Sequence, residues 1–383
     1  MGRLETASGR LIAVVVAIAA TVAIWIIVFG GGDGGANGQR SGPDMEISAA
    51  AAELVAGLSD SQKVEQLILA GFDPGAAELP ISAPGAVFIA TTNWPGAAEG
   101  AQLIAEIRSQ VLGSGGIAPL IVTRQEGGEY RELLDLPPEP RPIEVGDNSD
   151  PGAAEALALQ TGEALRSVGI DLNLAPVADV ASLDSPIADR AFSDDVETVA
   201  QMVAASTRGC RKAEIACAAA HFPGLGAASQ DTNEGPATVG VDRAGLAGRD
   251  LLPFQAAFEE RIAAVVLSHA FYSAFDPITP ASLAPEIATG LLREELGFEG
   301  LAITDDLGAG AIRSGYTTEE AAVLAIAAGA DMVQIRDPSA VIRVRKALIA
   351  ALAGGQISRE RLDEAAARVL ELKDELEAST GAD

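Results

Sequence analysis

The stretch AHFPGLG, residues 220–226, decides the fold assignment and comes directly after the apolar run from Ile215 to Ala219. An apolar run that ends at a histidine and breaks into a proline and two glycines is typical of a buried strand that opens into an irregular loop. In a (β/α)8 barrel, the loops that follow the carboxyl ends of the strands carry the functional residues. The next residues, AASQDTNE at 227–234, therefore belong to a candidate functional loop.

Short apolar runs alternate with helical patterns from Met45 onward, which is the pattern of repeated strand and helix units. Eight runs predict eight strands, the number that closes one barrel. The predicted strands are residues 66–70, 86–89, 118–122, 171–174, 215–219, 263–267, 301–304 and 332–335, and the clearest helices are 150–168, 198–212, 318–328, 339–352 and 358–377. We therefore predict the α/β class, with a single (β/α)8 TIM-type barrel over residues 46–378.

An uncharged apolar run from Leu11 to Phe29 precedes the barrel and is close to the length that spans a bilayer. Arg3 and Arg10 lie before it, and the next basic residue is Arg40, so the positive-inside rule places the N-terminus in the cytoplasm. A cleaved signal peptide is the alternative. We predict a cytoplasmic tail at 1–10, a single-pass anchor in the cell membrane at 11–29, a flexible Gly-rich linker at 30–45, and an extracytoplasmic barrel.

Composition excludes several classes of partner and cofactor. The formal net charge of −28 makes nucleic acid an unsuitable partner, because phosphate neutralisation requires clustered Lys and Arg. The only histidines are His221 and His269, and they belong to no cluster with the spacing of metal ligands, so we predict neither a metal nor another cofactor. Cys210 and Cys217 are the only cysteines, and the sequence allows either a disulfide or two buried thiols.

Polar motifs after the predicted strands resemble those of glycoside hydrolase family 3, in particular the single-domain bacterial β-N-acetylhexosaminidases that act on cell-wall amino sugars. The resemblance extends over nearly all of residues 45–377, in the family's order. The matching motifs are RQEGG at 124, LNLAPVADV at 172, DRAFSDD at 189, AHFPGLG at 220, PASLAP at 280 and LLREELGFEGLAITDDLGAGAI at 291.

This resemblance implies a retaining glycosidase in which Asp305, after the seventh strand, is the nucleophile. A retaining enzyme requires a carboxylate that attacks the anomeric carbon and forms a glycosyl-enzyme. Arg190 and His221 match positions that contact the sugar in the family. His269, at the end of the sixth strand, is a further candidate for substrate binding, with a purely structural role as its alternative.

The family's acid/base is a histidine two residues after an aspartate, and this chain departs from that pattern. Asp231 is retained, but the histidine position holds Asn233, whose amide has no titratable proton to give. Glu234 is adjacent, and we consider it a candidate proton donor as well as a plain exposed loop acid.

The sugar-contacting positions also differ from the family pattern. Arg124 stands where the family has Asp, Ala220 where it has Lys, and Glu129 and Glu132 at two Arg places. Two functions follow as hypotheses. One is a membrane-anchored hydrolase that acts on amino-sugar glycans of the cell wall; the other is a catalytically impaired member that binds glycan or a protein partner.

Overall fold

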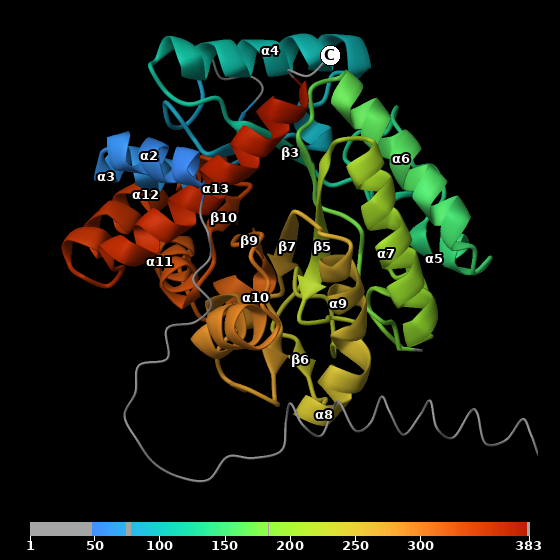
Figure 1. The fold of residues 1–383 in the computed structure, drawn as a ribbon. Coiled ribbons are helices and arrows are strands. Elements are labelled where there is room, and N and C mark those ends of the chain that lie inside the picture. The colour runs from blue at the N-terminus through green and yellow to red at the C-terminus, as the bar shows by residue number, and fades with distance from the viewer. Residues whose placement is uncertain (1–47, 74–77, 183, 381–383) are drawn as a thin grey trace, which may run out of the picture. The chain divides into compact units, whose positions relative to one another are not determined.

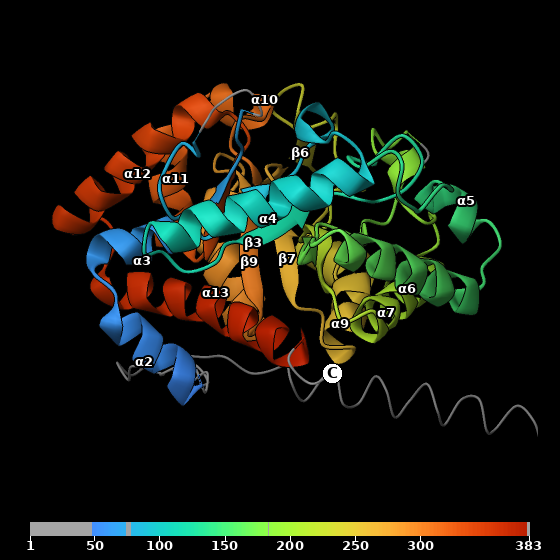
Figure 2. The same cartoon turned by 90° about the horizontal axis from the view of Figure 1, so that it is seen from above.

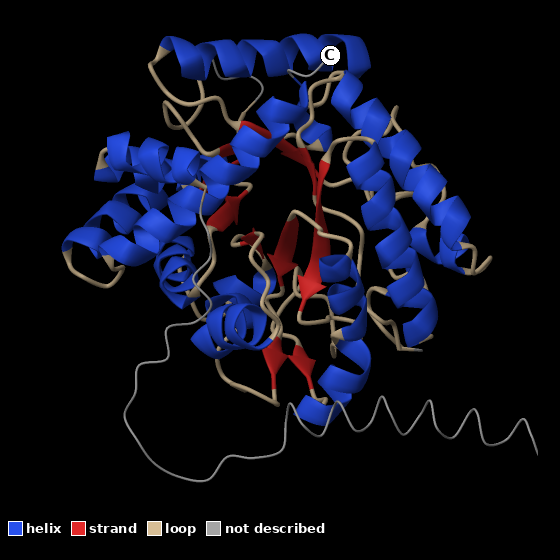
Figure 3. Ribbon diagram, in the orientation of Figure 1, coloured by secondary structure: helices blue, strands red, loops and turns tan. Residues whose placement is uncertain are grey.

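A closed barrel of eight parallel strands lies at the centre of the computed structural model, which describes residues 48–73, 78–182 and 184–380. Figure 3 shows these strands enclosed by helices. Neighbouring strands pair in the order β1-β10-β9-β7-β5-β4-β3-β2, and pairing between β1 and β2 closes the barrel. The strands are β1 (Ile68–Ala70), β2 (Ala86–Phe88), β3 (Leu120–Thr123), β4 (Leu172–Asn173), β5 (Ala216–Phe222), β7 (Ala264–Leu267), β9 (Leu301–Asp306) and β10 (Met332–Ile335). Each predicted strand overlaps one of these, so the predicted barrel is confirmed.

Helices alternate with the strands and cover the outside of the barrel (Figure 1). The five helices predicted from periodicity correspond to α6, α7, α11, α12 and α13. The α-helices are α2 (Ala49–Gly57), α3 (Asp60–Gln66), α4 (Ala97–Gly113), α5 (Pro142–Gly146), α6 (Pro151–Ser167), α7 (Val196–Lys212), α8 (Arg243–Gly245), α9 (Leu252–Glu259), α10 (Gly310–Arg313), α11 (Thr318–Ala328), α12 (Pro338–Ala353) and α13 (Arg359–Thr380). A π-helical segment, Glu286–Glu295, lies between β7 and β9.

Two hydrophobic layers hold the barrel together. Inside it, β5 contributes Ala216, Ala218 and Ala220 at every second position, as expected for a strand whose alternate side chains face one side. Cys217 and Ala219, which lie between them, belong to the outer layer that packs against the surrounding helices. Val369 and Leu372 of α13 pack into the inner layer, and Figure 2 shows α13 running beneath the strands. The helix therefore closes one end of the barrel and leaves the other end for the functional loops.

A buried carboxylate joins α13 and the π-helical segment to the barrel wall. Asp331, directly before β10, accepts hydrogen bonds from Arg293 Nη2 at 2.7 Å, Arg361 Nη2 at 2.6 Å and Arg368 Nη1 at 3.0 Å. Its Oδ2 also accepts from the Ala302 N–H of β9 at 2.9 Å. Burial raises the pKa of Asp331, but the three guanidinium groups outweigh this effect and lower the pKa below its ordinary value. The carboxylate is therefore ionised at neutral pH.

We expect Asp331→Asn to lower the free energy of unfolding by about 3–5 kcal/mol, because it leaves buried guanidinium groups without their counter-charge. Since the folded-state pKa is lowered, this stabilisation is present above the ordinary carboxyl pKa of 3.8 and is lost as the pH falls below it. Urea unfolding at pH 7 measures the loss. Glu295→Gln, which breaks the exposed ion pair with Arg243, is the control and should change stability by less than about 1 kcal/mol. Equal effects of the two substitutions would contradict the assignment.

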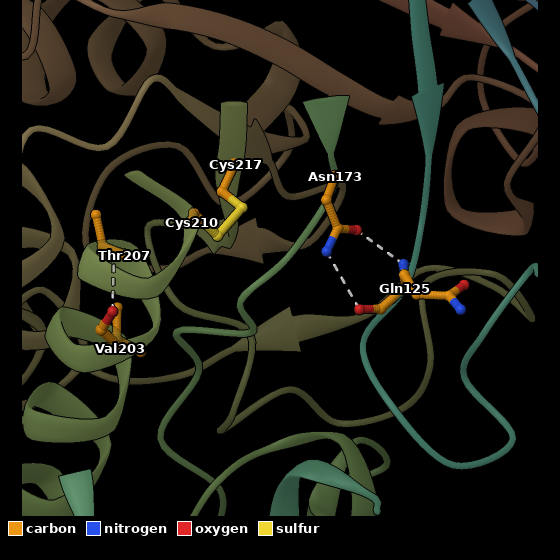
Figure 4. Close-up of a disulfide and its surroundings, with 6 residues drawn as sticks. All are labelled: Gln125, Asn173, Val203, Thr207, Cys210 and Cys217. Carbon is orange, nitrogen blue, oxygen red and sulfur yellow. Dashed lines mark hydrogen bonds between the residues drawn. A yellow bond between two sulfur atoms is a disulfide. The ribbon is translucent and has the colours of Figure 1, made fainter. Parts of the chain in front are cut away.

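Cys210 in α7 and Cys217 in β5 form a disulfide (Figure 4). Of the two alternatives that the sequence allowed, the structure therefore contains the cross-link. Beside it, the side-chain oxygen of Asn173 in β4 accepts the N–H of Gln125, and its Nδ2 donates to the Gln125 carbonyl. The disulfide attaches the end of α7 to the strand that carries His221.

Reduction of this disulfide is expected to lower the free energy of unfolding by about 2 kcal/mol, the loop-closure entropy for cysteines 7 residues apart. Urea unfolding with and without reductant measures the difference. The double variant Cys210→Ser, Cys217→Ser should match the reduced protein and should not respond to reductant. Alkylation of both thiols in the folded protein without any reductant would contradict the cross-link.

The predicted tail, membrane anchor and linker, residues 1–45, lie outside the described residues. Across 48–73, 78–182 and 184–380, no helix combines the length and the apolar character needed to span a bilayer. The anchor at 11–29 therefore stays a prediction from the sequence.

Candidate active site

The carboxyl ends of the barrel strands surround a narrow pocket. Five of the predicted site residues line it: Arg124, Arg190, His221, Asn233 and Asp305. The lining is completed by Phe88, Glu126, Leu174, Ala220, Val266, Gln334 and Arg336. The other three predicted residues, Asp231, Glu234 and His269, lie outside this lining. The barrel thus assembles side chains from segments more than 200 residues apart in the sequence.

Asp305 lies near the carboxyl end of β9, with its side chain partly buried in the pocket. Its Oδ1 accepts the N–H of Asp306 at 2.8 Å. Burial raises the pKa of Asp305, but the neighbouring imidazoles of His221 and His269, the Asp306 N–H and Arg190 outweigh this effect, so the pKa is below its ordinary value. The group is therefore an ionised carboxylate at neutral pH, which is the state that a nucleophile requires.

A chain of buried polar groups lies beside Asp305. Asp179, after β4, accepts from the backbone N–H of His221 through Oδ1 at 3.2 Å and contacts its Nδ1 through Oδ2 at 2.7 Å. His221 Nε2 contacts Arg190 Nη2 at 3.1 Å. Arg190 also donates two hydrogen bonds to Glu126, at 2.6 and 2.8 Å. This fixed network leaves both His221 and Arg190 with little freedom to move.

The contact with Arg190 identifies the protonation state of His221. A guanidinium can only donate hydrogen bonds, so His221 Nε2 must accept, and Nδ1–H then donates to Asp179. Burial lowers the pKa of His221, but the Asp179 carboxylate outweighs this effect and raises it. Protonation of Nε2 would nevertheless place two N–H groups against each other, so the geometry corresponds to the neutral imidazole. His221 is thus held as a positioned polar group beside Asp305.

Glu132 is the centre of a second cluster, on the wall formed by the segments after β2, β3 and β10. Its Oε1 accepts from Arg124 Nη2 at 3.3 Å and from Arg336 Nη2 at 2.8 Å. Its Oε2 accepts from the N–H and the hydroxyl of Thr91, at 2.9 and 3.0 Å. Burial raises the pKa of Glu132, but Arg336, Thr91 and Arg124 outweigh it and lower the pKa. Glu132 therefore binds two arginines, one from the segment after β3 and one from the segment after β10.

The loop after β5 places Asn233 at the pocket. Its backbone is attached to the start of α10, because the Gly310 N–H donates to the Asn233 carbonyl at 3.0 Å. Asp231 Oδ1 accepts from the backbone N–H of Asn233 at 2.8 Å and from its Nδ2 at 3.0 Å. Asp231 therefore fixes the orientation of the Asn233 amide. Glu234 is exposed and is not among the pocket residues, so this geometry gives no support to its role as a proton donor.

His269 and Asp306 lie beneath the pocket and have structural partners. His269 is fully buried, with Nδ1 2.7 Å from Ser282 Oγ and Nε2 3.0 Å from the Asp306 carbonyl. A carbonyl only accepts, so Nε2–H donates to it. Burial lowers the pKa of His269, which favours neutral imidazole with Nδ1 as the acceptor from Ser282. Asp306 Oδ1 accepts the N–H groups of Gly308 and Arg336. Of its two alternatives, His269 thus has the contacts of a structural histidine that supports the end of β9.

Four residues at the site were not predicted from the sequence: Glu126, Asp179, Gln334 and Arg336. Glu126 and Asp179 lie within the quoted motifs RQEGG and LNLAPVADV, and an acid in the loop that follows a predicted strand is the signal that would have identified them. Gln334 lies inside a predicted strand, and Arg336 follows it with no motif around it. Within the described residues, no group of three or more His, Cys, Asp or Glu could hold a metal ion.

Comparisons with known proteins agree with this arrangement. A beta-hexosaminidase of Stenotrophomonas maltophilia is 34% identical over 249 residues, which cover 63% of this chain and 73% of the relative. A beta-hexosaminidase of Methylococcus capsulatus is 32% identical over 275 residues, which cover 70% of this chain and 80% of the relative.

Solved structures resemble the barrel closely. A beta-N-acetylhexosaminidase from Beutenbergia cavernae has 33% identity and a TM-score of 0.75, over 85% of this chain and all of that chain (100%). A glycoside hydrolase family 3 beta-N-acetylglucosaminidase from Paenibacillus has 31% identity and a TM-score of 0.78, but the likeness spans only 64% of its chain. Residues 61–372 match the family described as glycosyl hydrolase family 3 N terminal domain. Given this match and the pocket around Asp305, the chain belongs to glycoside hydrolase family 3, among its hexosaminidase-like members.

Proposed function

We propose that the barrel cleaves β-linked amino-sugar glycans by a retaining mechanism with Asp305 as the nucleophile, and that its turnover is limited by the missing proton donor. The observation that carries this proposal is the ionised Asp305 carboxylate in the pocket, beside His221 and Arg190. The names of the similar beta-hexosaminidases support an N-acetylhexosamine unit as the sugar.

In the first step, a carboxylate oxygen of Asp305 attacks the anomeric carbon, and the bond from that carbon to the leaving oxygen breaks. In the second step, water attacks the same carbon, and the Asp305 carboxylate is released. The neutral His221 and the guanidinium of Arg190 are held rigidly by Asp179 and Glu126, so they can orient the sugar without moving. Fixed partners of this kind are expected to stabilise the transition state more than the substrate.

Asn233 affects both steps. In the first step it has no proton to give to the leaving oxygen, and in the second it cannot remove a proton from water. Substrates with a good leaving group need little help from an acid, so they should react quickly in the first step and slowly in the second. The glycosyl-enzyme should then accumulate.

The proposed place of action is outside the cytoplasmic membrane, with the chain anchored by the predicted segment 11–29. The bond between Cys210 and Cys217 supports this compartment, because disulfides form and persist in oxidising surroundings. Cell-wall glycans that contain amino sugars lie within reach of a barrel on a short Gly-rich linker.

A second candidate is a protein that binds glycan or a protein partner without turnover. The observation that favours it is the cluster of Arg124, Glu132 and Arg336, which occupies one wall of the pocket with side chains that bind each other. Asn233 alters the expected proton donor, and this cluster alters the side chains expected to contact the sugar.

Mass spectrometry of the intact protein mixed with 2,4-dinitrophenyl N-acetyl-β-glucosaminide distinguishes the two candidates. The proposed function predicts a stoichiometric mass increase of one N-acetylhexosamine unit, which peptide mapping should place on Asp305. Azide, a nucleophile that needs no general base, should remove the adduct and yield the β-glycosyl azide. If no adduct and no released dinitrophenol are detected with this donor or with the matching hexoside, the binding protein is the correct candidate.

A further inference from the structure

One wall of the pocket carries more positive charge than its own acids neutralise. Arg124 and Arg336 share a single carboxylate, and both donate to the same oxygen, Glu132 Oε1. The other oxygen of Glu132 is occupied by Thr91. Two guanidinium groups on one carboxylate leave a net charge of about +1 at this wall. Arg190 does not add to it, because the buried Glu126 accepts two hydrogen bonds from that guanidinium and neutralises it.

Arg124 lacks an acceptor for part of its guanidinium. Its Nε is buried and has no hydrogen-bond partner within the described residues. The nearest carboxylate oxygen, Glu126 Oε1, is 4.0 Å from Nε and already accepts from Arg190 at 2.6 Å. A buried N–H without an acceptor is costly, and most such groups in native proteins have a partner. A molecule in the pocket that carries an acceptor oxygen would satisfy this N–H, because Arg124 lines the pocket.

Gln334 gives an independent indication of a ligand. Its side chain is only 3% exposed, lines the same pocket, and has an oxygen, Oε1, that no donor within the described residues contacts. A sugar hydroxyl is a donor of the right kind for this amide oxygen. Gln334, whose amide oxygen lacks a donor, and Arg124, whose Nε–H lacks an acceptor, thus line the same pocket.

The positive charge of Arg124 and Arg336 indicates which kind of acceptor they would bind. Asp305 cannot serve Arg124 or Arg336 without losing the freedom to attack, and Glu126 and Glu132 have their partners already. A carboxylate on the sugar satisfies the guanidinium groups better than a hydroxyl does, because hydrogen bonds between charged partners are about twice as strong as neutral ones. Arg124 stands where the family has Asp. The side chain at this position is therefore a cation, which favours binding of an anion.

We infer that the pocket takes a glycosyl unit that carries a carboxylate, and that Arg124 and Arg336 bind this carboxylate while Gln334 accepts a hydroxyl of the same sugar. This inference rests on the proposed function in so far as it names the class of sugar for the same pocket. The carboxylate can come from carbon 6 of a uronic acid or from a 3-O-lactyl group, and both present the same chemistry to the two arginines.

Calorimetric titration of the full chain with four free sugars at pH 7 tests the inference. Glucuronate is compared with glucose, and N-acetylmuramate with N-acetylglucosamine. At least one acid should bind about tenfold or more tightly than its neutral partner, and the preference should weaken as salt screens the charges. The pair that shows the preference identifies the position of the carboxylate. Equal affinities within both pairs, or no binding of any of the four sugars, would overturn the inference.

Variants test whether the two arginines are responsible. Arg124→Gln and, separately, Arg336→Gln should reduce binding of the preferred acid to the level of its neutral partner. Arg359→Gln, which removes an exposed arginine at the start of α13, is the matched control and should keep the preference. Arg124→Lys and Arg336→Lys should keep part of the preference for the acid. Thermal melting excludes variants that do not fold, and an equal loss for acid and neutral sugar contradicts the inference.

Binding is measured here without turnover, so the outcome is separate from that of the proposed function. A preference for the acid without any glycosyl-enzyme from a glycoside of that acid would support this inference and refute hydrolysis. A glycosyl-enzyme without any preference for the acid would refute this inference and support hydrolysis.

Discussion

Asn233→His is expected to raise kcat/KM for phenyl N-acetyl-β-glucosaminide by about 10²- to 10⁴-fold, the usual contribution of a general acid. Asp231 already accepts from the Asn233 side chain, at 3.0 Å between Oδ1 and Nδ2, so it can hold the ring of the new histidine in the same way. The loop backbone is attached to α10 through Gly310, so the substituted side chain should enter the pocket at the same place. The physical reason is that an imidazole with a pKa near 6.5 can exchange protons at neutral pH and an amide cannot.

Leaving-group dependence is the measurement that identifies an acid. The gain should be largest for phenyl and small for 2,4-dinitrophenyl in the first chemical step, because a dinitrophenolate departs without a proton. Asn233→Gln is the control and should produce no gain. Adding Asp231→Asn to Asn233→His should remove most of the gain, since the ring then loses its partner. A gain that is equal for both leaving groups would mean that the histidine acts by some other route.

Asp305→Asn is expected to reduce release of dinitrophenol from the activated glycoside by roughly 10⁴-fold or more, as typical for removal of a nucleophile. The amide is nearly the same size as the carboxylate, so the pocket should keep its shape while it loses the attacking oxygen. No glycosyl-enzyme should form, and azide should not restore activity, because azide replaces water in the second step and not Asp305 in the first.

Asp306→Asn is the matched control, because the neighbouring carboxylate caps the Gly308 and Arg336 N–H groups and takes no part in the proposed attack. Its amide oxygen can still accept those hydrogen bonds, so we expect a loss of less than about tenfold. Stopped-flow measurement of the dinitrophenol burst compares the two variants directly. If Asp306→Asn lost the burst and Asp305→Asn kept it, the two aspartates would have to exchange roles.

Much of the fold was predictable because its signals are local. A buried strand of a parallel barrel is a short apolar run, and each of the eight runs became a strand within a few residues of its predicted ends. Helix starts were equally local: Asp150 accepts from the Gly152 N–H and Thr317 from the Glu320 N–H at the starts of α6 and α11. The pairing of Cys210 and Cys217 was not predictable, because a separation of seven residues allows either state of the sulfurs.

The candidate site was predictable only in part. His221, Arg190 and Asp305 were identified by their places after strands and by the family motifs, and all three line the pocket. Glu234 was a candidate because it is next to Asn233 in sequence, yet adjacent residues in a loop need not face the same way, and its side chain is exposed. No sequence motif marked Arg336 as a site residue. In the structure its guanidinium lies 4.6 Å from the centroid of the Phe88 ring and forms part of the pocket wall.

By itself, the sequence determined the barrel and the order of its strands and helices, and it predicted a nucleophile at Asp305 and the loss of the proton donor at Asn233. These features depend on the type and spacing of neighbouring residues, which the chain displays directly. Only the tertiary structure decided that Glu132 binds both Arg124 and Arg336, and that Glu126 is committed to Arg190. Those contacts join residues up to 204 positions apart, and their geometry exists only once the barrel has closed.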